Sequence, residues 1–108
     1  MTIPEMTARE FLARRAAGEP MTLLDVREDW EIQVSPVPAQ HRHIPMGQIA
    51  DRIAELDPQI ETVVVCRSGG RSLQVANYLG DRGFSSVHNL AGGILAWSRE
   101  VDPSIPQY

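Results

Sequence analysis

The sequence predicts an α/β fold, namely a three-layer α/β/α domain with a small, mostly parallel central sheet of four to five strands. Short apolar segments alternate along the chain with longer segments whose apolar residues recur at helical spacing, and this alternation is typical of α/β proteins. Residues 21–26 and 62–66, MTLLDV and TVVVC, are apolar on both faces. Strands of that kind suit a parallel sheet that helices cover on both sides.

Length and composition point to one ordinary globular unit, and we expect a single domain over residues 1–108. The chain is 43% hydrophobic and 22% charged, with ten arginines, no lysine and a formal net charge of -4. This balance argues against a nucleic-acid partner. No apolar run approaches the ~20 residues of a membrane span, and no signal-peptide pattern opens the chain. We therefore expect a cytoplasmic protein without a membrane partner.

A helix is predicted over residues 7–17, and a strand follows over residues 21–26. Thr7 and Glu10 have the spacing of a helical capping box, which marks a helix start. Gly18 follows the last helical residue, as glycine commonly does at helix ends. The chain is thus expected to begin with a helix that leads into a strand.

The middle of the chain is expected to hold a loop and then a helix. Residues 34–47 are rich in proline and histidine and are predicted to be an irregular loop. Ile49, Ile53 and Leu56 then fall on one helical stripe, which Pro58 ends.

The second half repeats the alternation of strand and helix. We expect, in order, a strand over 62–66, a helix over 71–83, a strand over 86–89, a helix over 92–97 and a packed tail over 102–108.

Four polar residues lie at or near the carboxyl ends of predicted strands. In an open parallel sheet the binding crevice lies at those ends. Cys66 ends one strand, whereas Asp25, Arg27 and Asn89 lie near the ends of others. We expect all four to border one crevice, provided that their strands neighbour the strand that carries Cys66.

The segment CRSGGRS, residues 66–72, joins a buried strand to an amphipathic helix. Gly69 and Gly70 allow the loop to curl with several N–H groups pointing inward, and such a ring binds anions. The helix start, Arg67 and Arg71 add positive charge, which stabilises a thiolate at Cys66. The loop therefore predicts a reactive cysteine.

A single cysteine can also be a core residue or a metal ligand. A cysteine after a valine run is often a small core residue, but a glycine-rich turn with two arginines favours an anion site instead. His41, His43 and His88 do not gather around Cys66 in the sequence pattern, so we expect neither a metal nor another cofactor.

The loop CRSGGRS resembles the active-site loop of rhodanese domains, a six-residue ring that begins at cysteine. LLDVRE resembles the second-strand signature of that family, HIPMG its histidine-isoleucine-proline-glycine turn with Met46 inserted, and NLAGGILAW its closing motif. The ending DPSIPQY resembles the tail of bacterial rhodanese modules, both free-standing and fused behind sulfur-carrier activating enzymes. These segments cover most of the chain.

This resemblance implies a sulfurtransferase in which the Cys66 thiolate takes a sulfur atom from a donor such as thiosulfate and holds it as a persulfide. A thiol, free or on a protein, would then accept the sulfur. The small anionic donor and the persulfide would be bound by Arg67, Ser68, Gly69, Gly70, Arg71 and Ser72. We expect a monomer.

The sequence indicates the roles of the residues around the loop less specifically. Asp25 and Arg27 either support the loop through hydrogen bonds or an ion pair, or are plain structural charges. Trp30 and Trp97 are expected to pack in the core or at the rim, and Trp30 could wall the crevice. His43 matches a turn histidine of structural or functional importance.

Two rival functions differ from sulfur transfer. Dual-specificity phosphatases of the cell cycle resemble the rhodanese fold, but they place five residues between cysteine and arginine and usually a histidine before the cysteine. Here four residues separate Cys66 from Arg71, and Val65 precedes the cysteine. A non-catalytic module that binds a protein partner is the other rival, although such modules often lack the cysteine.

Overall fold

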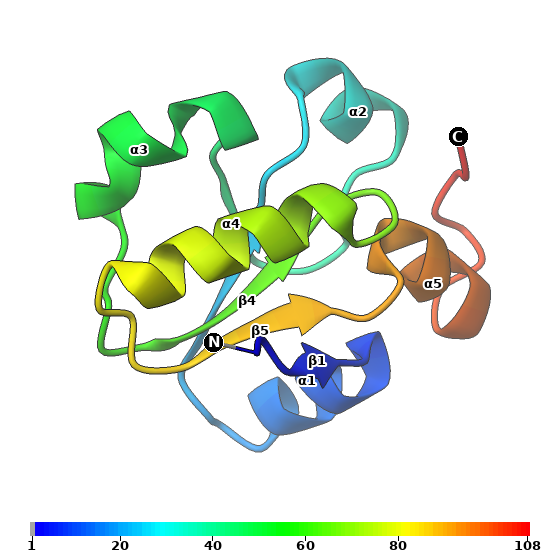
Figure 1. The fold of residues 1–108 in the computed structure, drawn as a ribbon. Helices are drawn as coiled ribbons and strands as arrows, with labels where there is room; N and C mark the ends of the chain where they lie inside the picture. The colour runs from blue at the N-terminus through cyan, green and yellow to red at the C-terminus, as the bar shows by residue number, and fades with distance from the viewer. Residues whose placement is uncertain (1) are drawn as a thin grey trace.

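The computed structural model describes residues 2–108 and contains one sheet of five strands, all parallel, in the order β1-β5-β4-β2-β3 (Figure 1). The strands are β1 (Glu5–Met6), β2 (Met21–Asp25), β3 (Arg42–His43), β4 (Glu61–Val65) and β5 (Val87–Leu90). The predicted α/β class and the predicted number of strands are confirmed. Because β2 and β5 flank β4 on either side, the strand ends that the sequence singled out are neighbours.

Helices cover both faces of the sheet. They are α1 (Ala8–Ala16), α2 (Asp29–Val34), α3 (Ile49–Arg52), α4 (Gly70–Asp81) and α5 (Gly93–Glu100), and one 3-10 turn lies on each side of α3. Figure 1 shows α3 and α4 on one side of the sheet and α1 with α5 on the other, which makes three layers. Within residues 2–108, none of the helices has both the length and the apolarity to span a membrane.

Alternate side chains of β4 enter two separate apolar cores. Val64 packs in the core beneath α3 and α4, whereas Val63 and Val65 pack in the core beneath α1 and α5. In the second core, the rings of Phe11 and Trp97 are tilted to one another with centroids 6.0 Å apart. Each fully buried valine or leucine contributes roughly 1.5–3 kcal/mol relative to an exposed one, so a central strand apolar on both faces is what this fold requires.

The prediction of an irregular loop over residues 34–47 was wrong in part, because β3 lies inside it. Two other elements, β1 and α2, were not expected. The strands β1 and β3 have two residues each, too few for any periodicity, and they exist because β5 and β2 offer them hydrogen bonds. Helix α2 begins with a capping box between Glu28 and Glu31. Its buried residue is the charged Glu31 and not an apolar one, so the sequence shows no apolar stripe there.

The helix predicted from Ile49, Ile53 and Leu56 is broken. Residues 49–52 form α3, and residues 53–55 tighten into a 3-10 turn. All three apolar side chains still pack in the core beneath α3 and α4. Their burial requires only that they share one side of the segment, and a short helix followed by a tighter turn meets that requirement.

An ion pair closes the carboxyl end of β2. The side chains of Asp25 and Arg27 are both fully buried, and Arg27 Nη2 lies 2.9 Å from Asp25 Oδ2. The guanidinium also donates to the main-chain oxygen of Ser35 at 2.8 Å and to the hydroxyl of Tyr108 at 3.0 Å. This arrangement joins β2, the end of α2 and the tail of the chain.

Asp25→Ala should lower the free energy of unfolding by about 3–5 kcal/mol, because it leaves the buried Arg27 guanidinium without its counter-charge. Urea denaturation measures the change. The matched control is Arg42→Ala, which breaks an exposed pair with Glu55 and should cost no more than about 1 kcal/mol. Equal losses in the two variants would contradict the importance that we assign to the buried pair.

Candidate active site

The Cys66 sulfur lies at the centre of a curled loop between β4 and α4. The N–H of Gly69 donates to Sγ at 3.1 Å, and the Ser72 hydroxyl lies 3.2 Å from Sγ. Gly69 has φ +116°, a left-handed conformation that lets the loop turn back before α4 begins. The sulfur thus lies beneath the N-terminal end of a twelve-residue helix.

This setting favours the thiolate. Burial of the side chain, which is 1% exposed, raises the pKa of the Cys66 thiol. The hydroxyl of Ser72 and three main-chain N–H groups stabilise the thiolate more strongly, so that the pKa lies below its ordinary value. These N–H groups belong to Ser72, Gly69 and Ser68. Since the thiolate is the nucleophile, the geometry is that of a reactive cysteine.

Asn89, on β5, holds the loop from the neighbouring strand. Its Oδ1 accepts a hydrogen bond from the Ser72 hydroxyl at 2.5 Å, and its Nδ2 donates to the Gly69 oxygen at 3.1 Å. The Ser72 hydroxyl has one proton, which it donates either to Asn89 or to the Cys66 thiolate. The sequence placed Asn89 near the crevice, and the structure shows that it positions two residues of the loop.

Helix α5 holds the carbonyl groups of the same loop. The N–H groups of Ile94 and Leu95 donate to the oxygens of Cys66 and Arg67 at 2.9 and 3.1 Å. A Cβ on Gly93 would lie 2.4 Å from the Arg67 oxygen, so only glycine permits this approach. Because α5 binds the carbonyls on one side, the N–H groups of the loop remain available to the sulfur on the other.

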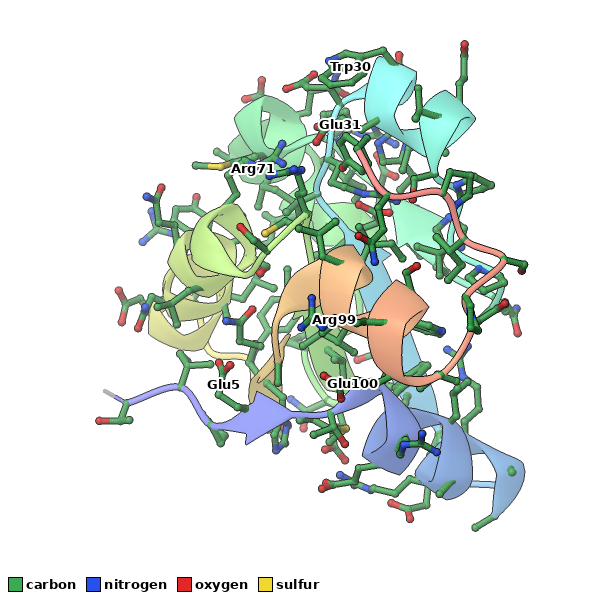
Figure 2. The ribbon with its side chains drawn as sticks, turned by 90° about the vertical axis from the view of Figure 1, so that its right-hand side faces the viewer. Glu5, Trp30, Glu31, Arg71, Arg99 and Glu100 are labelled. Carbon is green, nitrogen blue, oxygen red and sulfur yellow. The ribbon has the colours of Figure 1, made fainter. Side chains whose placement is uncertain are left out.

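Arg71 lies in the first turn of α4, and we call the side of the loop that carries Arg67 and Arg71 its mouth. Arg71 pairs with the carboxylate of Glu31, a residue that the sequence did not indicate. Its Nη1 and Nη2 donate to Glu31 Oε2 and Oε1 at 2.7 and 2.8 Å, and Figure 2 shows the two side chains together, one from α4 and one from α2. The Arg71 guanidinium lowers the pKa of Glu31 to about 2. The capping-box spacing of Glu28 and Glu31 was the one signal that could have indicated α2, although not this pairing.

Arg67 turns toward the tail of the chain. Its guanidinium donates to the main-chain oxygen of Tyr108, with Nε at 2.7 Å, and lies over the Tyr108 ring at 5.2 Å. The Tyr108 ring meets Trp30 edge-on with centroids 5.8 Å apart, and Trp30 is 60% exposed. Trp30 is thus a rim residue, which was one of the two positions expected for it. The contacts of Tyr108 with Arg67 and Trp30 were not expected from the sequence.

Asp25 and Arg27 are buried at the end of β2 and do not contact the loop with their side chains. Their side chains are fully buried, and within residues 2–108 they pair with each other, Ser35 and Tyr108, not with residues 66–72. His43 Nε2 lies 2.6 Å from the main-chain oxygen of Arg27, so His43 belongs to the same group of contacts as the Asp25–Arg27 pair. The expectation that Asp25 and Arg27 would border the crevice was wrong, because their opposite charges pair and leave solvent together.

Comparison with known proteins identifies the family of this domain. The family described as "Rhodanese-like domain" matches residues 7–100. The chain belongs to the rhodanese-like family. It is similar to the Bacillus subtilis protein YtwF, at 41% identity over 103 residues covering 95% of this chain and 98% of that protein. A protein of Allochromatium vinosum named sulfurtransferase is 35% identical over 103 residues, 95% of each chain.

Similar domains occur within a longer protein and in a solved structure. A rhodanese-like/PpiC domain-containing protein of Arabidopsis thaliana chloroplasts is 47% identical over 90 residues, and the match spans 30% of that protein. The crystal structure of a rhodanese-like domain protein from Staphylococcus aureus superposes with a TM-score of 0.82 at 27% identity, covering 98% of this chain and 99% of that one. The rhodanese-like fold is therefore shown by both sequence and structure.

In this rhodanese-like domain the loop can do two things chemically. The Gly69 N–H and the Ser72 hydroxyl can stabilise an anionic sulfur at Cys66, and a thiolate favoured in this way can act as a nucleophile.

Ser72→Ala should raise the pKa of the Cys66 thiol, because the thiolate loses its hydroxyl donor. Absorbance at 240 nm against pH reports the thiolate, and its midpoint should move to higher pH. Ser68→Ala is the matched control, since Ser68 acts through its main-chain N–H and should leave the midpoint in place. Equal midpoints in the two variants would contradict this role of the Ser72 hydroxyl.

Gly93→Ala should push α5 away from the loop and lower the free energy of unfolding by about 1–3 kcal/mol, because the new Cβ meets the Arg67 oxygen in a left-handed backbone. Thermal denaturation and the thiolate titration should both change. Gly47→Ala is the control, because a Cβ there meets nothing within 4 Å. If both variants behave alike, the close approach at Gly93 does not matter.

Proposed function

We propose that this protein is a sulfurtransferase that moves a sulfane sulfur from thiosulfate or a persulfide donor to a thiol or other nucleophilic acceptor, through a persulfide on Cys66. The observation that carries the proposal is the position of Cys66 Sγ at the start of α4, 3.1 Å from the Gly69 nitrogen and 3.2 Å from the Ser72 hydroxyl. Relatives that share nearly the full length of the chain include a protein named sulfurtransferase, and they support a sulfurtransferase-type function.

In the first half-reaction the Cys66 thiolate attacks the outer sulfur of the donor, and the donor's S–S bond breaks with its electron pair. Thiosulfate would leave as sulfite. The loop then holds the anionic persulfide through its main-chain N–H groups and the Ser72 hydroxyl. The proposed site comprises Cys66 as nucleophile and, for binding, Arg67, Ser68, Gly69, Gly70, Arg71 and Ser72.

In the second half-reaction an external nucleophile removes the sulfur. The 108 residues contain one cysteine, so no second thiol among them can resolve the persulfide. The acceptor is a free thiol or a group on a protein, and no cofactor takes part in either step. A monomeric state and a cytoplasmic location stay predictions, which light scattering and cell fractionation can check.

Intact-protein mass spectrometry after incubation with thiosulfate should show the gain of one sulfur atom, which a reductant removes. Cys66→Ala should gain none, and Cys66→Ser should lose more than 99% of sulfur transfer, roughly the factor of 10² or more expected when a nucleophile is removed. Absence of any gain with thiosulfate and with an organic persulfide would favour the non-catalytic binding module. Hydrolysis of p-nitrophenyl phosphate that depends on Cys66 would favour the phosphatase instead.

A further inference from the structure

Two arginines lie at the mouth of the Cys66 loop, and they differ in their partners. Arg71 pairs through both terminal nitrogens with the Glu31 carboxylate, at 2.7 and 2.8 Å. Arg67 binds a main-chain oxygen of Tyr108, the final residue of the sequence. The Glu31 carboxylate cancels the charge of Arg71.

The negative charge of Glu31 is fixed in position. Its side chain is 4% exposed, and besides Arg71 it accepts a hydrogen bond from the Tyr108 hydroxyl at 2.8 Å. Its Oε2 also accepts from the N–H of Glu28, so the carboxylate cannot turn away from α4. Figure 2 shows Glu31 between Arg71 and Trp30 at the same edge of the molecule. With its pKa lowered to about 2 by Arg71, Glu31 stays ionised at neutral pH.

Arg71 is the second residue of α4, and the N-cap residue of that helix, Gly69, donates its N–H to Cys66 Sγ, so the pair lies on the helix end that faces the sulfur. The pKa of Arg71 is raised chiefly by Glu31, and the charge of the Cys66 thiolate adds to that effect. Glu31 and the Cys66 thiolate therefore offset the charge of Arg71, while the Arg67 guanidinium is bound to Tyr108. A dianionic donor meets no net attraction there, while the whole chain, at -4, repels it.

We propose that Glu31 is a specificity-determining residue, which by neutralising Arg71 biases the Cys66 site toward sulfur donors with at most one negative charge, such as organic persulfides, over dianionic thiosulfate. This inference rests on the proposed sulfurtransferase function and names the donor class of the same site. Glu31 does not touch the reacting sulfur atoms and acts through Arg71.

The favoured step balances without any other reagent. The Cys66 thiolate attacks the terminal sulfur of a persulfide R–S–SH and forms a new S–S bond. The old S–S bond breaks, and its electron pair leaves with R–S⁻. The transferred sulfur keeps its proton, which it loses to water if the enzyme persulfide ionises.

The test compares two donors that differ by one charge. Methanethiosulfonate carries a methyl group where thiosulfate carries an oxyanion, so the pair is nearly equal in size. Glu31→Gln keeps the shape of the side chain and removes its charge. The value of kcat/KM should rise about tenfold for thiosulfate and about threefold for methanethiosulfonate, because the effect of one unit charge scales with the donor charge.

Asp29→Asn is the matched control. It removes a charge from the same helix at a side chain that is 86% exposed and does not contact Arg71, so the ratio of the two kcat/KM values should stay at the wild-type level. An unchanged or lower thiosulfate preference in Glu31→Gln would overturn the proposal. Equal losses with both donors would instead make Glu31 a support that only holds Arg71 in place, which also overturns it.

A measurement on the wild-type protein keeps the proposal testable if Glu31→Gln does not fold. Its kcat/KM for thiosulfate should stay level or rise when salt is increased from about 0.01 to 0.15 M, because a neutral mouth has no attraction to screen. A fall of more than about threefold would overturn the proposal. If neither donor loads sulfur onto wild-type Cys66 in the mass spectrum, the proposed function itself fails, and that outcome is separate from a failure of the Glu31 inference.

Discussion

The arrangement of the site depends on how the carbonyl groups after β4 are bound. The N-terminal N–H groups of α5 take the oxygens of Cys66 and Arg67, and Gly93 allows the two segments to approach. A loop whose carbonyls are bound on one side presents its N–H groups on the other. The burial of Cys66, the lowered pKa of its thiol and the place for an anion follow from this contact.

A second set of contacts supports the mouth of the loop from the other side of β4, where β2 lies. The buried pair of Asp25 and Arg27 ends β2 and reaches the Tyr108 hydroxyl, which in turn donates to Glu31. Glu31 then holds Arg71. The buried charges of Asp25, Arg27 and Glu31 each have an ion-pair partner, as the low dielectric of a protein interior demands. The tail of the chain thereby becomes part of the site.

The α5 contact and the contacts that end at Glu31 have opposite effects on the charge around Cys66. The loop needs positive potential to hold a thiolate or persulfide, and it obtains this from main-chain dipoles at the start of α4. The arginines contribute less than their number suggests, because Glu31 cancels Arg71. Stabilisation of the bound sulfur and attraction of the donor are consequently separate properties, which depend on different residues.

The sequence by itself determined the layered α/β fold, the position of Cys66 at a strand end and the glycine-rich turn after it. These features are local, because apolar periodicity and glycine spacing act on neighbouring residues. Only the tertiary structure decided the pairings of Arg71 with Glu31, Ser72 with Asn89 and Arg67 with Tyr108, which join residues 40, 17 and 41 positions apart. Such pairings depend on which strands are neighbours and how far each helix extends, and no local pattern carries that information.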